Sequence, residues 1–204
     1  TGQTKNSANI NLRWEKRLFA FKVEADIHKL QLASFTNELK TTPGFNWLGY
    51  VQAARHCADN NLDLNQALTW ADQAIAERFV GQRNFQTLST KAYVLSKMGK
   101  NEQADQLMAE ALPMGNVTDL HQYARSLLNN KKNKQALEVY QLNYKKSPDV
   151  YTTNVGLMRG YAANGDFKKA IHYAAKAIKQ APDPTNKEYL ENLLKKLENR
   201  TDIN

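Results

Sequence analysis

The sequence predicts an all-α protein: a right-handed superhelical stack of about four helix pairs, preceded by a β-hairpin and followed by a capping helix. Apolar residues recur at helical spacing in successive segments, and glycine or proline interrupts the pattern between them. A small residue also opens the second helix of each pair, at Ala67, Ala104, Ala136 and Ala170, with separations of 37, 32 and 34 residues. A spacing this regular indicates an array of similar units.

The N-terminal segment has the period of strands. Apolar and polar residues alternate over residues 8–14 and again over residues 19–23, which predicts a hairpin with one apolar face. A lone hairpin is only marginally stable in water, so this face needs cover from the repeats, from another chain, or from strands of a further domain. We therefore divide the chain into residues 1–25, the end of a larger β domain, and residues 26–204, the helical repeat domain.

The helical elements follow in order along the chain. Residues 26–40 have a helical pattern that stops at the segment Thr-Thr-Pro-Gly, residues 41–44, and the first helix pair runs from about residue 45 to residue 80. Glycine ends the first helix of later pairs at Gly99 and Gly165. The last helix is expected to begin at Thr185, with Glu188 completing an N-terminal capping box. Its polar outer side suits the end of a stack, where the final unit would otherwise expose an apolar face.

Several positions in register resemble the tetratricopeptide repeat, a helix-pair unit of 34 residues. Twelve residues before three of the alanines lie Ala92, Ala124 and Met158, and Met158 stands where a small residue is usual. Twelve residues after two of the alanines lie Pro148 and Pro182. The signature tryptophan is absent from the last three copies, so these are degenerate repeats. The resemblance implies that the first helix of each pair lines a concave groove that binds a protein or peptide.

A second resemblance covers nearly the whole chain. The segment NSANINLRWEK, then KVEAD, then helices and the tail NKEYLENLLKKLENRTDIN are similar to a bacterial family of exported proteins of unknown function. In that family a small β-sandwich precedes tetratricopeptide-like repeats, and the hairpin matches the end of the sandwich. The resemblance implies a place in the periplasm or cell envelope and brings no activity with it. Because the sequence itself has no signal peptide, this location rests on the resemblance alone.

No constellation of residues predicts catalysis, a metal or a cofactor, so we expect a protein that is not an enzyme. The four histidines lie far apart in the sequence and lack a second ligand at helical spacing. Cys57 follows His56 directly, but adjacent helical residues point about 100° apart and do not face each other. Gly156 and Gly160 lie within a helix, where they allow close packing. The sequence has no run of about 18 apolar residues that could span a bilayer.

The net charge of +8 is concentrated late in the chain, where residues 116–204 carry 15 basic and 9 acidic residues. Binding of nucleic acid would need these cations on one surface with aromatic or arginine side chains between them. Most of the lysines are expected at turns or on the outer side of second helices, without aromatic neighbours. This pattern favours a solvated face over a nucleic-acid surface.

The candidate site consists of residues beside the packing stripe of the first helices, which would line the groove. Tyrosine and arginine are enriched at interface hot spots, and the set includes both: Arg55, His56, Gln86, Ser89, Tyr93, His121, Arg125, Asn129, Thr152 and Arg159. The lysine, asparagine and arginine pattern of the repeat family's carboxylate clamp is absent. We expect a non-catalytic scaffold that binds a protein or peptide partner in its groove. The alternative is structural support for a ligand-binding N-terminal β domain.

The hairpin adds one further expectation. Unpaired strand edges recruit other strands, and a two-fold dimer is the commonest self-complementary arrangement. We therefore expect either a homodimer through the hairpins of two copies or docking of the apolar row, Phe19, Phe21 and Val23, onto the first helices.

Overall fold

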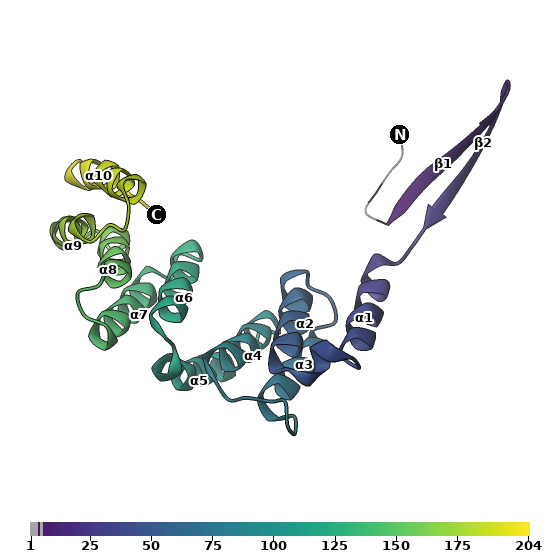
Figure 1. Cartoon of the computed structure of the whole chain (residues 1–204), viewed down its shortest axis with the longest axis horizontal. Coiled ribbons are helices and arrows are strands. Elements are labelled where there is room, and N and C mark those ends of the chain that lie inside the picture. Colours follow the sequence, from purple (N-terminus) through teal and green to yellow (C-terminus); the bar gives the residue numbers. More distant parts are fainter. Residues whose placement is uncertain (1–3, 5) are drawn as a thin grey trace. The chain divides into compact units, whose positions relative to one another are not determined.

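The structure is a computed structural model that describes residue 4 and residues 6–204, and Figure 1 shows its elements in chain order. Two strands come first and are followed by ten α-helices within this described part. The chain divides into two compact units, Thr1–Met108 and Ala109–Asn204, and the boundary falls within one helix, α5 (Asn101–Ala111). None of the described helices is long and apolar enough to cross a membrane.

The hairpin pairs β1 (Ser7–Trp14) with β2 (Arg17–Glu24) in antiparallel register. Ile10 lies opposite Phe21 and Leu12 opposite Phe19, so these side chains share one face, and the predicted apolar face is confirmed. The connecting turn places Glu15 at a φ of 51°, in the left-handed region that favours glycine.

The apolar face of the hairpin is exposed to solvent. Trp14 is 74% exposed and Phe19 is 56% exposed, and the neighbouring Ile10, Leu12, Phe21 and Val23 are also exposed. The expectation that the row docks onto the first helices is therefore not met in the described part of the chain. This face is therefore free to contact a further domain or another molecule.

Unit 1 continues with four helices and the start of a fifth, and a side chain caps the start of each of the first four. They are α1 (Ile27–Glu38), α2 (Trp47–Asp59), α3 (Leu64–Ala76), α4 (Phe85–Lys97) and α5 (Asn101–Ala111), and a short 3-10 turn spans Thr42–Phe45. The Asp63 carboxylate accepts from two backbone amides at the start of α3. Asn84 and Thr87 cap each other reciprocally at the start of α4, which satisfies amides that the helix leaves unpaired.

The core of unit 1 is built on small residues where helices cross. α2 packs against α3, and both also lie beside α4. Ala54, Ala67 and Ala71 have no exposed surface, and Trp70 fills the space beside them. The alanines allow the helix axes to approach closely, toward the short end of the usual range of about 8 to 10 Å. The predicted inward position of Ala67 is therefore confirmed.

Unit 2 contains the remaining helices: α6 (Val117–Asn129), α7 (Asn133–Lys146), α8 (Tyr151–Ala163), α9 (Phe167–Lys179) and α10 (Pro184–Glu198), preceded by a 3-10 turn over Leu112–Met114. The predicted N-terminal cap of the last helix is wrong by two residues. Asp183 caps α10 by accepting from the Asn186 amide at 2.8 Å, and Pro184 occupies the first helical position. Proline suits that position because its missing N–H would have no helical partner. Thr185 is therefore inside the helix.

Consecutive helices of unit 2 pack side by side, and α6 also lies beside α8 (Figure 1). Ala136, Ala170 and Ala174 are fully buried. The Tyr140 ring lies against the two helical glycines of α8, where a Cβ added at Gly156 would sit 2.5 Å from Tyr140 Cδ1 and one added at Gly160 would sit 2.9 Å from Cδ2. The prediction that these glycines allow close packing is confirmed.

These observations confirm an all-α stack of helix pairs preceded by a hairpin and closed by a last helix. Gly99 and Gly165, which were expected to end first helices, both have a φ of 78°. Both lie just after α4 and α8. A left-handed residue after the last turn is the usual glycine stop of a helix.

The crossing in the fourth pair can be tested with a larger side chain. Ala170→Leu should overpack the contact between α9 and its neighbours and lower the free energy of unfolding by about 1 to 3 kcal/mol. Ala175→Leu is the matched control, because Ala175 is in the same helix and exposed. Circular dichroism melts of the two variants measure the difference. Equal melting temperatures would contradict the burial of Ala170.

Candidate partner-binding faces

The predicted site residues all fall on, or at the end of, the first helices of the pairs. In unit 1 they belong to α2 and α4, and in unit 2 to α6 and α8. α2 lies beside α4 in unit 1, and α6 lies beside α8 in unit 2. We call the surface they share the first-helix face of unit 1 and of unit 2, and each is described on its own.

Tyr93 is the centre of the first-helix face of unit 1. Its hydroxyl donates a hydrogen bond to Asp59 Oδ1 at 2.7 Å, across from α4 to the end of α2. The Arg55 guanidinium lies over the ring, 5.0 Å from its centroid, and Lys97 Nζ lies 5.4 Å from the same centroid. Burial raises the pKa of Tyr93 to about 12, helped by the hydrogen bond and charge of Asp59 and opposed by Arg55. The face thus presents a tyrosine that is fixed in place between cations.

The other residues predicted in unit 1 differ in accessibility. His56 is half-buried, with its ring 5.0 Å from that of Phe35 on α1, and its Nε2 has no hydrogen-bond partner. Gln86 is exposed, and the Ser89 hydroxyl donates to the Gln86 carbonyl at 3.2 Å. The helix α1 therefore covers His56, which was predicted to face a partner, while Arg55, Gln86 and Tyr93 retain accessible surface.

In unit 2 the face gathers four of the predicted residues. His121 and Arg125 come from α6, and Thr152 and Arg159 come from α8. Burial lowers the pKa of His121, the charges of Arg159 and Arg125 lower it further, and a hydrogen bond to the Thr152 backbone acts in the opposite direction. Asn129 lies at the exposed end of α6. Because its pKa lies below 6.5, the His121 imidazole is mostly neutral at physiological pH.

Tyr140 belongs to this region and was not predicted there. Its ring is 5.5 Å from that of His121, the residue is 1% exposed, and its hydroxyl has no hydrogen-bond partner among the described residues. Burial raises its pKa to about 12, and Arg159 and Arg125 act against that rise. A second helix supplies this side chain, so an assignment based on first helices alone could not include it.

Arg159 is held by the end of the chain. One nitrogen, Nη2, donates to the Tyr189 hydroxyl at 2.9 Å, and the other, Nη1, donates to the Ile203 carbonyl at 3.2 Å. Neither Arg159 nor Arg125 forms an ion pair within the described residues. The face therefore carries two arginines whose charge no carboxylate of unit 2 neutralises.

Two lysines of unit 2 lie over aromatic rings, although most of them were expected to have no aromatic neighbour. Lys169 Nζ lies 5.0 Å from the centroid of Tyr161, and Lys176 Nζ lies 5.9 Å from that of Tyr173. The two tyrosine rings stack on each other at 5.7 Å, so one face of each is already used. Both lysines also form ion pairs, with Asp166 and Asp149. Cations that are already paired and rings that are already stacked are poorly suited to bind a phosphate backbone and its bases.

The thiol of the single cysteine, Cys57, is unreactive. Cys57 is fully buried, and burial raises its pKa to about 11, with the charge of Asp63 acting in the same direction. A thiol must ionise to act as a nucleophile, so Cys57 behaves as a small core residue. The described residues contain no group of three or more histidine, cysteine, aspartate or glutamate side chains that could hold a metal.

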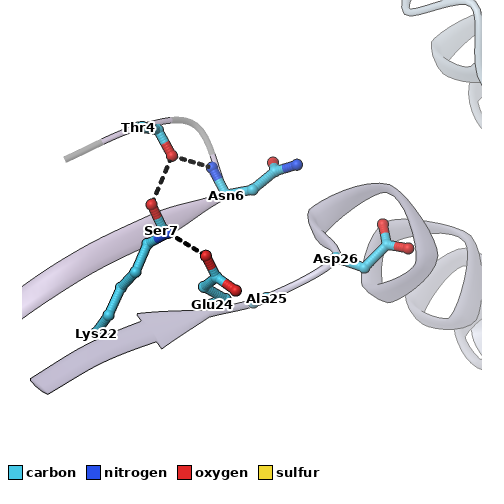
Figure 2. A pocket seen from close by; sticks show the side chains of 7 residues that line it. All are labelled: Thr4, Asn6, Ser7, Lys22, Glu24, Ala25 and Asp26. Atoms are coloured by element: carbon cyan, nitrogen blue, oxygen red, sulfur yellow. Dashed lines mark hydrogen bonds and ion pairs between the residues drawn. The ribbon is translucent and has the colours of Figure 1, made fainter. Parts of the chain in front are cut away.

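A shallow hollow of about 460 Å³ lies at the open end of the hairpin (Figure 2). Most of the side chains that line it are polar, and several bond to one another: Thr4 Oγ1 and Ser7 Oγ are 2.8 Å apart, and Lys22 pairs with Glu24. None of the predicted site residues belongs to it. The side chains that line it bond to one another at the ends of the two strands, and they do not form a ligand site.

Comparison with known proteins adds little to this description. No family model and no curated protein matches the chain. Two solved structures are similar at 16% identity: MamA 41-end from Desulfovibrio magneticus RS-1 has a TM-score of 0.45 and covers 74% of this chain and 86% of that chain. The MamA RS-1 ArsTM double mutant has a TM-score of 0.43 and covers 74% of this chain and 93% of that chain.

Likenesses this distant carry no argument about a partner or a role. The spacing of the pairs and the pairing of first helices come from the chain itself. The fold is tetratricopeptide-like.

The lowered pKa of His121 predicts how stability depends on pH. Because the folded-state pKa lies below the ordinary value of 6.5, the unfolded chain takes up a proton first as the pH falls. Stability is therefore fully present above pH 6.5 and is lost as the pH falls toward the folded-state pKa. Urea unfolding at about pH 7.5 and about pH 5 should show this loss, and His121→Gln should reduce it. The control is His172→Gln, at an exposed histidine on α9. An identical pH response in both variants would exclude His121 as the source.

Proposed function

We propose that this chain is a non-catalytic scaffold that holds a protein or peptide partner on its first-helix faces. The observation that carries the proposal is the concentration of large polar and aromatic side chains there, with Arg55 and Tyr93 in unit 1 and Arg125 and Arg159 in unit 2. Tyrosine and arginine supply much of the binding energy at protein interfaces because they combine a large contact area with hydrogen bonding.

The arrangement of Tyr93 supports the same proposal. Its ring is fixed by Asp59 at one end and flanked by Arg55 and Lys97 over its surface. A side chain that is already ordered loses less conformational entropy when a partner binds, which improves affinity. The fixed tyrosine is thus suited to act as an anchor for binding.

We also propose a location in the cell envelope of a bacterium. The support is the resemblance of the hairpin segment and the C-terminal helix to exported proteins that join a β-sandwich to helical repeats. Fractionation of cells that express the natural gene tests this directly. Recovery of the protein with the cytoplasm would overturn it.

Truncation of the two faces tests the scaffold. Tyr93→Ala and Arg125→Ala should each weaken binding of a captured partner by about 2 kcal/mol, or roughly thirty-fold, because hot-spot residues typically contribute that much. The chain would first capture its partner from solubilised envelopes, and titration of the purified pair would then give the affinities. Lys134→Ala, at an exposed cation on α7, is the matched control. A double variant that binds as tightly as the wild type would refute the assignment of the faces.

A second candidate function follows from the exposed hairpin. The exposed row of Ile10, Leu12, Phe19, Phe21 and Val23 is more apolar surface than two strands normally leave in water. A β domain packed on this face would explain it, and the helical units would then serve as its support. Deletion of residues 1–25 separates the candidates, because capture on the first-helix faces survives the deletion and ligand binding by such a β domain does not.

The same row predicts self-association of this chain. Sheets that pack face to face bury such rows between them, so we expect dimers through two hairpins at high protein concentration. Light scattering should show a mass that rises with concentration. Replacing Phe19 and Phe21 by lysine should abolish the rise while the circular dichroism melt of the helices stays the same. A monomer at every concentration would exclude the homodimer.

A further inference from the structure

The last four residues of the sequence do not extend away from α10. Arg200 has a φ of 54°, and the backbone amides of Arg200 and Thr201 both donate back into the last turn at 2.9 Å, to Leu197 and Lys196. A left-handed residue with this pair of bonds reverses the chain at the end of a helix, a place where glycine is favoured. The turn directs residues 201–204 toward α8.

Three contacts fix this segment on α8. Arg159 Nη1 donates to the Ile203 carbonyl at 3.2 Å, and Asn204 Nδ2 donates to the Arg159 carbonyl at 3.3 Å. The Ile203 side chain is half-buried against the apolar cluster that includes Met158, Leu190 and Leu197. One aliphatic side chain and a few polar bonds thus hold a short non-helical segment, as they would hold a bound peptide.

The surface around the segment has unused binding capacity. Arg125 lies on α6, which packs beside α8, the helix that carries Arg159. The charges of both arginines also act on His121 and Tyr140. Asp202, the acidic residue of the segment, bonds to the Asn204 amide instead of to either arginine. Because the arginines lack carboxylate partners among the described residues, a longer acidic segment would fit this surface better than residues 201–204 do.

We infer that residues 201–204 are an internal ligand on a peptide site formed by α8 and α10. This site takes an extended segment of a partner, in which an aliphatic residue takes the place of Ile203 and a carboxylate pairs with Arg125 or Arg159. This inference rests on the proposed scaffold function and names the chemistry of its partner. The partner displaces residues 201–204 when it binds. The chain's own segment competes because its tether gives it a high effective concentration.

The segment itself supplies the probe. A peptide with the sequence ENRTDIN, residues 198–204, acetylated and amidated at its ends, is titrated into ¹⁵N-labelled protein. A variant that ends at Arg200 should bind the peptide, and its amide signals should shift at Met158, Arg159 and Leu190. The full chain should bind it about tenfold more weakly, because its own segment occupies the site. Full-length Ile203→Ser, which releases the segment without shortening the chain, should behave like the truncated variant and decides the matter if truncation prevents folding.

Two further arms test specificity. A peptide with serine in the place of Ile203 should not bind. A peptide with aspartate in the place of both asparagines should bind at least about threefold more tightly, and the gain should disappear in about 0.5 M salt and in Arg125→Gln, as expected for charge pairing. Sodium phosphate is added separately, and competition by phosphate with loss of the isoleucine requirement would mean an anion site and overturn the peptide site.

Other outcomes also decide the question. If the folded variants give no shifts, or if the serine peptide binds as well as ENRTDIN, residues 201–204 only brace α10 and the inference is wrong. That failure differs from failure of the scaffold. Loss of the internal-ligand site leaves partner capture through Tyr93 intact, whereas absence of any captured partner leaves binding of ENRTDIN to the truncated variant intact.

Discussion

Close crossing of the paired helices depends on very small side chains at the points of nearest approach. Ala67, Ala136 and Ala170 are fully buried at these points, and the glycines of α8 leave no room for even one methyl group beside Tyr140. Protein interiors are packed at nearly crystalline density, so such contacts tolerate little change in volume. Only small side chains fit at the points where a first helix crosses its neighbour. The larger side chains of these helices therefore lie away from these points.

The two faces meet this constraint in different ways. In unit 1, Arg55, Tyr93 and Asp59 form a contact between α2 and α4 that orders the surface without any partner. In unit 2, buried polar atoms of His121 and Tyr140 have no hydrogen-bond partner among the residues that the structure describes, and two arginines near them have no carboxylate partner there. The polar groups of this surface are therefore less fully satisfied than those of unit 1. Burial of polar groups without partners costs free energy. In the same unit, Ile203 and Asn204 contact Arg159.

The sequence alone predicted the elements well because their signals are local. Helical spacing gave the pairs, Gly99 and Gly165 gave the stops, and alternation gave the hairpin with its apolar face. The start of α10 was misplaced because Asp183 and Thr185 are both good caps, and the proline between them decided for Asp183. Contacts such as Phe35 with His56, or Ile203 with Arg159, join residues far apart in the chain. No periodicity encodes them, so the cover over two predicted site residues could not be foreseen.

The burial of Cys57 has a consequence for the environments in which the chain can fold. A chain with one cysteine cannot close a disulfide within itself, and a thiol whose pKa is about 11 exchanges slowly with oxidants and other thiols at neutral pH. The native state is therefore independent of the redox poise of its surroundings. The same polypeptide would keep its helix pairs in reducing and in oxidising surroundings alike.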